Sequence, residues 1–154
     1  MNYKYKIKFS KYNEEKNIYY IVISTYLGEF DAICKLHEED FDIKSNFFGY
    51  MIAEMRAYNK YLKRQKYIIK QQYNILSDLN YELQQMKNYN KDCLEARKLR
   101  KKMYEKKEEM QKINKIINTV SNNIINEINN YRTNLKKSLE LLEEKKKKRI
   151  ESSE

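Results

Sequence analysis

The sequence predicts an α+β fold in which a small antiparallel β-sheet is followed by a long helical hairpin. Three observations support this prediction. Residues 3–34 contain short runs that alternate apolar and polar side chains, which is the period of a half-buried strand. From residue 47 onward apolar residues recur every three or four positions, which is the period of a coiled-coil seam. The 154 residues include two glycines and no proline, which excludes a turn-rich all-β fold.

The N-terminal part, residues 1–44, contains three expected strands. The first alternates lysines with apolar residues that we expect to share one buried face, namely Tyr3, Tyr5, Ile7 and Phe9. Residues 18–26 are β-branched and aromatic and give the strongest strand pattern. A third run alternates at Phe30, Ala32 and Cys34. These runs predict a three-stranded β-meander, which is too small to fold without support from the helices or a second copy.

Residues 45–144 are expected to form the long helical coiled-coil hairpin. The first helix should begin at Ser45 or Asn46, either of which can cap it. Its apolar stripe, interrupted by Gln65 and Gln72, consists of Met55, Leu62, Ile69, Leu76, Leu79, Leu83 and Met86. The second stripe consists of Leu99, Met103, Met110, Ile113, Ile117, Val120, Ile124, Ile128, Tyr131, Leu135, Leu139 and Leu142.

The turn of the hairpin is expected near residues 88–92. This stretch has the weakest helix propensity between the two stripes, and Asp92 with Glu95 resembles a capping box that starts a new helix. The sequence leaves open a bend at residues 121–123, where Ser and Asn compete for backbone hydrogen bonds. Residues 145–154 contain a block of five cations and are expected to form a basic, disordered tail.

All of the positive excess lies in the second part of the chain. Residues 1–44 carry a net charge of −1 and residues 45–154 a net charge of +11. Cations and tyrosines interleave in a first cluster of candidate partner-binding residues, Arg56, Tyr58, Lys60, Tyr61, Lys63, Arg64 and Tyr67. A second cluster contains Arg97, Arg100 and Lys101. Such residues suit an anionic partner, with tyrosines as anchors. The alternative is that the lysine stems only cover the seam.

The sequence offers little for catalysis or for a metal. With two glycines, neither a P-loop nor a dinucleotide-binding glycine motif can form, so the protein is not expected to be an enzyme. Cys34 and His37 have metal-ligand spacing but lack a second pair, so no metal or cofactor is expected. Cys34 and Cys93 are expected to stay reduced in the cytoplasm. There is no apolar run of membrane-spanning length and no apolar signal core.

Residues 28–42 and 49–57 resemble a stretch of small accessory proteins of phages that infect low-GC Gram-positive bacteria. The shared features are a strand ending in Cys34, an acidic loop at Asp40 and Asp42, and a Gly-x-x-x-Ala-x-x-Arg-Ala helix entry starting at Gly49. The resemblance covers about 30 residues and assigns no role to any of them. It implies a setting, because such phage proteins often bind and disable host defence machinery such as CRISPR effectors.

We therefore expect a non-enzymatic, cytoplasmic binding protein, most readily a homodimer. Its expected role is anti-defence (anti-CRISPR-like), with basic, tyrosine-bearing helices docked on a host defence protein, a ribonucleoprotein or another acidic protein surface. Two alternatives stay open. One is a nucleic-acid-binding coiled coil, whose affinity would fall steeply with salt. The other is a protein that sequesters a small anionic nucleotide messenger.

Overall fold

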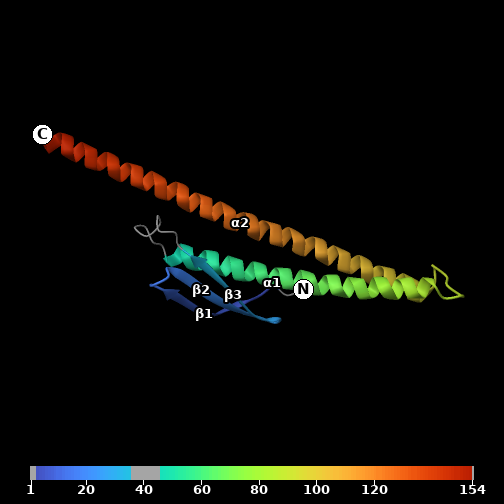
Figure 1. Cartoon of the computed structure of the whole chain (residues 1–154). Coiled ribbons are helices and arrows are strands. Elements are labelled where there is room, and N and C mark those ends of the chain that lie inside the picture. The colour runs from blue at the N-terminus through green and yellow to red at the C-terminus, as the bar shows by residue number, and fades with distance from the viewer. Residues whose placement is uncertain (1–2, 36–45, 154) are drawn as a thin grey trace.

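The computed structural model describes residues 3–35 and 46–153. In chain order it contains strands β1 (Lys6–Asn13), β2 (Ile18–Thr25) and β3 (Gly28–Lys35), then helices α1 (Asn46–Gln84) and α2 (Leu94–Ser153). The strands form one antiparallel sheet in the order β1-β2-β3. The sheet lies on one side of the first half of α1, and α2 runs back along the other side (Figure 1). The predicted α+β fold with a helical hairpin is confirmed.

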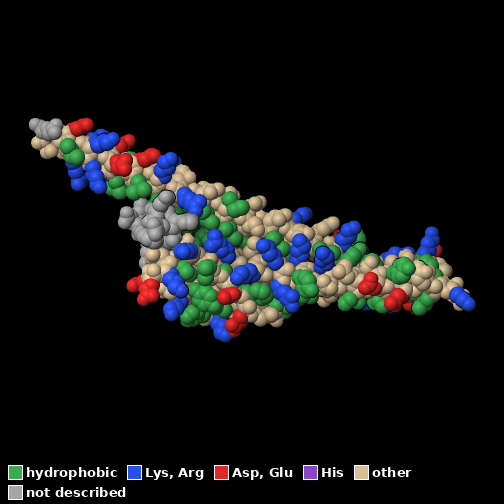
Figure 2. Space-filling model, in the orientation of Figure 1, with side chains coloured by type: hydrophobic (Ala, Val, Ile, Leu, Met, Phe, Trp, Pro, Cys, Tyr) green, Lys and Arg blue, Asp and Glu red, His purple; other side chains and the backbone are tan. Residues whose placement is uncertain are grey.

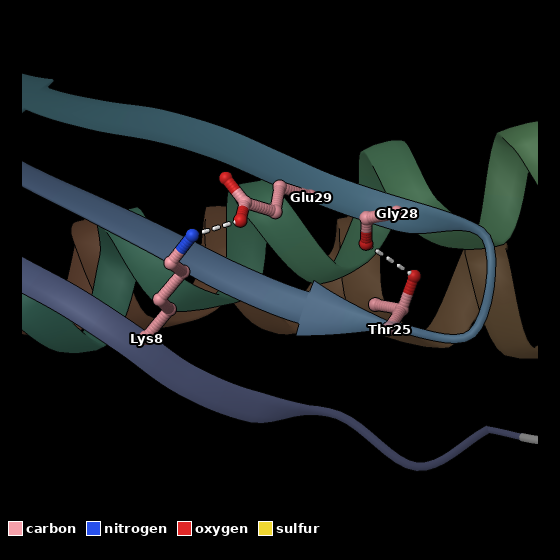
Figure 3. Close-up of polar contacts among 4 residues, drawn as sticks. All are labelled: Lys8, Thr25, Gly28 and Glu29. Carbon is pink, nitrogen blue, oxygen red and sulfur yellow. Dashed lines mark hydrogen bonds and ion pairs between the residues drawn. The ribbon is translucent and has the colours of Figure 1, made fainter.

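The turn between β2 and β3 is short and well defined. Thr25 pairs with Gly28, and the Thr25 hydroxyl donates to the Gly28 carbonyl at 2.7 Å. Gly28 has a φ of +112°, a conformation that side chains rarely adopt, so glycine is required here. Close to this turn an ion pair between Lys8 and Glu29 joins β1 to β3 across the central strand (Figure 3).

A β-bulge in β1 overturns part of the expected burial pattern. The pairing register shifts between Ile7 and Phe9, so Lys8 is an extra residue. An inserted residue reverses the alternation of faces. Tyr5 and Tyr12 therefore pack on the core, whereas Phe9 is 48% exposed and meets the ring of Tyr20 edge-on. The expectation of one buried face is therefore wrong at Phe9. It is also wrong at Ile7, which precedes the bulge and is 51% exposed.

The core between the sheet and α1 is formed mainly by β2. Tyr19, Ile21 and Ile23 point from β2 toward the helix and are buried. Opposite them α1 presents Ala53 and Ala57, whose small side chains allow the sheet to approach the helix closely. Burying a side chain as large as Ile21 or Ile23 stabilises the fold by about 1.5–3 kcal/mol. The sheet is thus supported by the helix, as its small size requires.

The two helices meet along the predicted stripes. Leu62 and Ile69 of α1 pack with Ile113 and Ile117 of α2 in a second buried cluster. Two further contacts fix the antiparallel register. Asn59 Nδ2 donates to Ser121 Oγ at 3.1 Å, and the rings of Phe48 and Tyr131 stack with centroids 4.0 Å apart. Toward both ends the stripes become exposed, at Leu79, Met86, Leu139 and Leu142.

Helix α2 is longer than the sequence analysis predicts. It continues without interruption through residues 121–123, so the described helix has no break there. It also includes residues 145–153, and the prediction of a disordered tail is wrong for these residues. Lys, Glu and Leu favour helix and neither glycine nor proline interrupts them, so the helix propagates through the charged block. Residue 154 lies outside the described residues.

Neither helix contains a stretch long and apolar enough to cross a membrane, among the residues that the structure describes. Cys34 of β3 is buried, Cys93 lies partly exposed in the hairpin turn, and neither cysteine is in a disulfide.

Candidate cationic interface

The first cationic cluster lies along α1 beside the edge of the sheet. Arg56, Lys60 and Lys63 follow a four-three spacing, which places them on one face of the helix. With Ala32 and Ile33 of β3 they line a groove of about 420 Å³, which also contains Asn59. Figure 2 shows Lys and Arg side chains gathered across the middle of the molecule, along the helices. The predicted cluster therefore includes one real surface feature, which we call the cationic groove.

Two of these cations bind the free edge of β3. Arg56 Nη1 donates to the Ile33 carbonyl at 3.0 Å, and Lys60 Nζ donates to the Asp31 carbonyl at 2.6 Å. Lys60 is also 3.8 Å from the Asp31 carboxylate. These bonds position both cationic heads at one wall of the groove. They also satisfy carbonyl groups that an edge strand would otherwise leave open to pairing with another chain.

The predicted residues Arg64 and Tyr67 lie on α1 next to Lys63, which lines the groove. Lys63 is exposed, and Arg64 places its guanidinium 5.2 Å from the ring centroid of Tyr67. Tyr67 is 51% exposed, so this cation–π pair presents both a charge and an aromatic face to solvent. Lys70 continues the same stripe one turn further along the helix. Residues 56–70 therefore carry a continuous cationic face.

Asn59 also lines the groove and was not predicted as a site residue. Its side chain is 9% exposed, its Nδ2 atom bonds Ser121, and its Oδ1 atom is buried without a partner among the described residues. The spacing of Met55, Asn59 and Leu62 is four then three, so the sequence did mark Asn59 as a seam position. A polar residue at such a position specifies the register of a helix pair at some cost in stability.

The structure corrects the role of two predicted tyrosine anchors. Tyr61 is 0% exposed and packs between the sheet and α1, where Gln65 donates to its hydroxyl at 2.8 Å. Tyr58 is half-buried, and its ring centroid is 5.0 Å from that of Tyr5. Tyr61 belongs to the core and Tyr58 largely does so, because α1 buries a second face against the sheet. Of the predicted tyrosines, only Tyr67 is available as an anchor.

Burial also changes the acidity of these core tyrosines. Burial, followed by the neighbouring Tyr26 and Tyr58, raises the pKa of Tyr61 to about 12. Burial and then the nearby Tyr3 raise the pKa of Tyr58. Both hydroxyls stay protonated at neutral pH, so they act as neutral hydrogen-bonding groups and add no charge to the groove.

The second cationic cluster lies elsewhere, at the start of α2. Arg97, Arg100 and Lys101 are exposed near the hairpin turn. The Arg100 guanidinium donates to the Lys91 carbonyl and so holds the turn in place. Counted along the antiparallel helices at 1.5 Å per residue, this cluster is roughly 30 Å from the cationic groove. The two predicted clusters therefore lie at separate places along the helical hairpin.

A second pocket lies at the N-terminal end of the sheet, and the described residues contain no candidate metal site. A pocket of about 480 Å³ lies between the start of β1 and the end of β2 and is lined by Tyr3, Lys4, Tyr5, Lys6, Ser24, Thr25 and Tyr26. Among the described residues, no group of three or more His, Cys, Asp or Glu side chains could hold a metal ion. His37, the proposed neighbour of Cys34, lies outside the described residues.

Comparisons of this chain with protein-family models, with curated proteins and with solved structures find no match.

Proposed function

We propose that the protein is a non-enzymatic binding protein that docks the cationic face of α1 on an acidic surface of a partner protein or nucleoprotein. One observation carries this proposal: Arg56, Lys60 and Lys63 converge on a single groove beside β3. Lys70 and the Arg64–Tyr67 pair extend that face by two helical turns. Arginine and tyrosine, which are both enriched in binding surfaces, are present in this face as Arg56 and the Arg64–Tyr67 pair.

The composition of the groove favours a protein surface over a nucleic acid. Ala32 and Ile33 give it an apolar wall, and two of its cations are already bonded to β3. Duplex DNA carries one charge per about 1.7 Å of its axis and is best bound by a long cationic track. The second cluster is too far away to extend the groove into such a track. Carboxylates flanked by apolar side chains fit this short, mixed surface better.

The proposed partner belongs to the defence machinery of a bacterial host, and binding takes place in the host cytoplasm. This part of the proposal rests on the resemblance of residues 28–42 and 49–57 to phage accessory proteins, which often bind and disable host defence machinery such as CRISPR effectors. On this view the protein acts by occupying an acidic surface that the defence protein needs, and it requires no cofactor.

The test compares two charge-reversed variants of the full chain. Lys63→Glu/Lys70→Glu reverses the groove face, and Lys107→Glu/Lys115→Glu makes the same change in net charge on exposed positions of α2. Tagged wild-type and variant proteins are incubated with nuclease-treated lysate of a defence-bearing bacterium, and the captured proteins are identified by mass spectrometry. We expect a partner that wild type and the α2 variant retain and the groove variant loses.

Two results would contradict the proposal. Equal capture by the groove variant and wild type would show that the cationic face does not form the contact. Capture that depends on nucleic acid, with an affinity that falls steeply as salt rises, would favour the nucleic-acid-binding alternative instead. For the small-messenger alternative, cyclic nucleotides should raise the melting temperature of the protein.

A further inference from the structure

Helix α2 extends well beyond the start of α1. The Asn59–Ser121 bond sets the antiparallel register, and counting from it places Asn46, the first residue of α1, opposite residue 134. The Phe48–Tyr131 stack gives the same register within one residue. Residues 135–153 therefore project past α1 by roughly 28 Å at 1.5 Å per residue. Figure 1 shows this projecting end of α2, which we call the α2 extension.

The α2 extension carries apolar residues that are not covered by any described part of the chain. Every residue from Lys136 to Ser153 is exposed. The stripe that packs on α1 continues into the extension with the same spacing, from Ile128 and Tyr131 to Leu135, Leu139 and Leu142. Leu139 is 42% exposed and Leu142 is 52% exposed. The intramolecular seam thus continues as an open seam of the same kind.

The charges of the extension form two adjacent blocks of opposite sign. Residues 140–144 contain Glu140, Glu143 and Glu144, and residues 145–149 consist of four lysines and an arginine. A parallel pair of extensions would place the basic block beside its own copy. An antiparallel pair centred near residue 144 would place the acidic block of each copy beside the basic block of the other. A two-fold axis requires this kind of self-complementary surface.

We propose that the α2 extension is a dimerisation element, which pairs antiparallel with the α2 extension of a second copy of this chain. In this arrangement Leu142 lies opposite Lys146 of the partner subunit, whose aliphatic stem covers the leucine while its charge stays in water. The bodies of the two copies lie at opposite ends of the paired segment and do not collide, because each pairs through the part of α2 that projects past α1. The pairing is independent of the cationic groove.

The test measures the mass of the full chain in solution by sedimentation equilibrium over a range of concentrations. We expect wild type to form a dimer, and Leu139→Asp/Leu142→Asp to remain a monomer with unchanged helix content by circular dichroism. Leu141→Asp is the control for a negative charge at an exposed leucine outside the stripe. Leu141 is also exposed and adjacent, but it lies on the opposite side of the helix from the stripe, so this variant should form dimers like wild type.

Two further measurements test the orientation. Raising salt from about 0.05 M to about 0.5 M should weaken an antiparallel dimer, whereas it would strengthen a parallel one by screening the like charges. Mixing Leu142→Cys and Lys146→Cys, each in a Cys93→Ala background, should give disulfides between the two different variants. Same-residue disulfides alone would overturn the antiparallel arrangement. A monomeric wild type, or a dimer that Leu139→Asp/Leu142→Asp leaves intact, would overturn the proposal.

Discussion

Gly49 of α1 lies against the ring of Tyr19 so closely that a Cβ atom at residue 49 would be 2.2 Å from Tyr19 Cδ2. The ring has little room to move. Tyr19 is fully buried, its hydroxyl donates to Asn46 Oδ1 at 2.7 Å, and its ring meets that of Tyr50 edge-on at 5.0 Å. Here glycine is required because of the space available and not because of its backbone angles. The contact brings the central strand and the start of α1 together.

Gly49→Ala should therefore destabilise the protein. Overpacking of a close contact costs about 1–3 kcal/mol. This loss exceeds the gain of at most about 1 kcal/mol that alanine brings within a helix. Urea unfolding monitored by circular dichroism measures the change. In a Tyr19→Leu background the penalty of Gly49→Ala should shrink, and an equal penalty in both backgrounds would show that the Tyr19 ring is not its cause.

The bond between Asn59 and Ser121 makes a second prediction. Ser121→Ala removes the partner of the buried Asn59 amide, and an unsatisfied buried polar group costs about 1–3 kcal/mol. The double variant Asn59→Leu/Ser121→Ala replaces both polar groups with apolar ones and should recover most of the lost stability. The measurement is the free energy of unfolding of both variants. If the double variant is less stable than Ser121→Ala, the site needs its polar pair.

A third prediction concerns the edge of β3. Arg56→Met/Lys60→Met keeps the aliphatic stems of both side chains but removes the donors that bind the Ile33 and Asp31 carbonyls. An uncovered edge strand is a template for pairing with other chains. Light scattering during prolonged incubation should increase for this variant. Lys63→Met/Lys70→Met makes the same change in net charge away from those carbonyls, and equal scattering from both variants would refute the explanation.

The buried tyrosines predict a loss of stability at alkaline pH. Burial, followed by neighbouring groups, raises the pKa of Tyr19 and of Tyr61 to about 12 in the folded protein. An unfolded tyrosine has a pKa of about 10. The folded state then binds more protons than the unfolded state above pH 10, so stability is full below about pH 10 and falls as pH rises toward 12.

This fall can be measured by urea unfolding at a series of pH values from about 8 to about 11.5, which spans the ordinary tyrosine pKa of about 10. The comparison that isolates one tyrosine is with Tyr61→Phe. This variant is less stable at neutral pH because Gln65 loses an acceptor, but its stability should fall less steeply with pH. Parallel slopes for the variant and wild type would exclude Tyr61 as a contributor.

The sequence was sufficient to predict the strands, the helices and the hairpin because each element has one dominant period. Leu62, Ile69, Ile113 and Ile117 lie on the two stripes and form the buried seam. The period alone could not reveal that α1 packs against two neighbours. Gln65 interrupts the apolar stripe in sequence, but it belongs to the face toward the sheet, where its 2% exposed side chain bonds Tyr61.

The candidate site was predictable only in part, because its two walls come from different elements of the fold. The spacing of Arg56, Lys60 and Lys63 places them on one face, and the structure places all three in one groove. The second wall of that groove comes from β3, and no local pattern indicates which strand edge meets which helix face. Tyr61 looked like an exposed anchor because its neighbours in sequence are charged, although its position one turn after Ala57 places it under the sheet.

The sheet covers only the first half of α1, and this has a consequence for how the molecule opens. Beyond Ile69 no residue of α1 is buried, and between Ala96 and Ile113 none of α2 is. Local opening is easiest where few apolar contacts are made. Within the part of the hairpin where α1 and α2 run side by side, backbone amides should therefore exchange with deuterium faster in residues 75–105 than around Ala57 and Leu62. The two helices should therefore separate first at the hairpin turn, while they stay packed where the sheet covers α1.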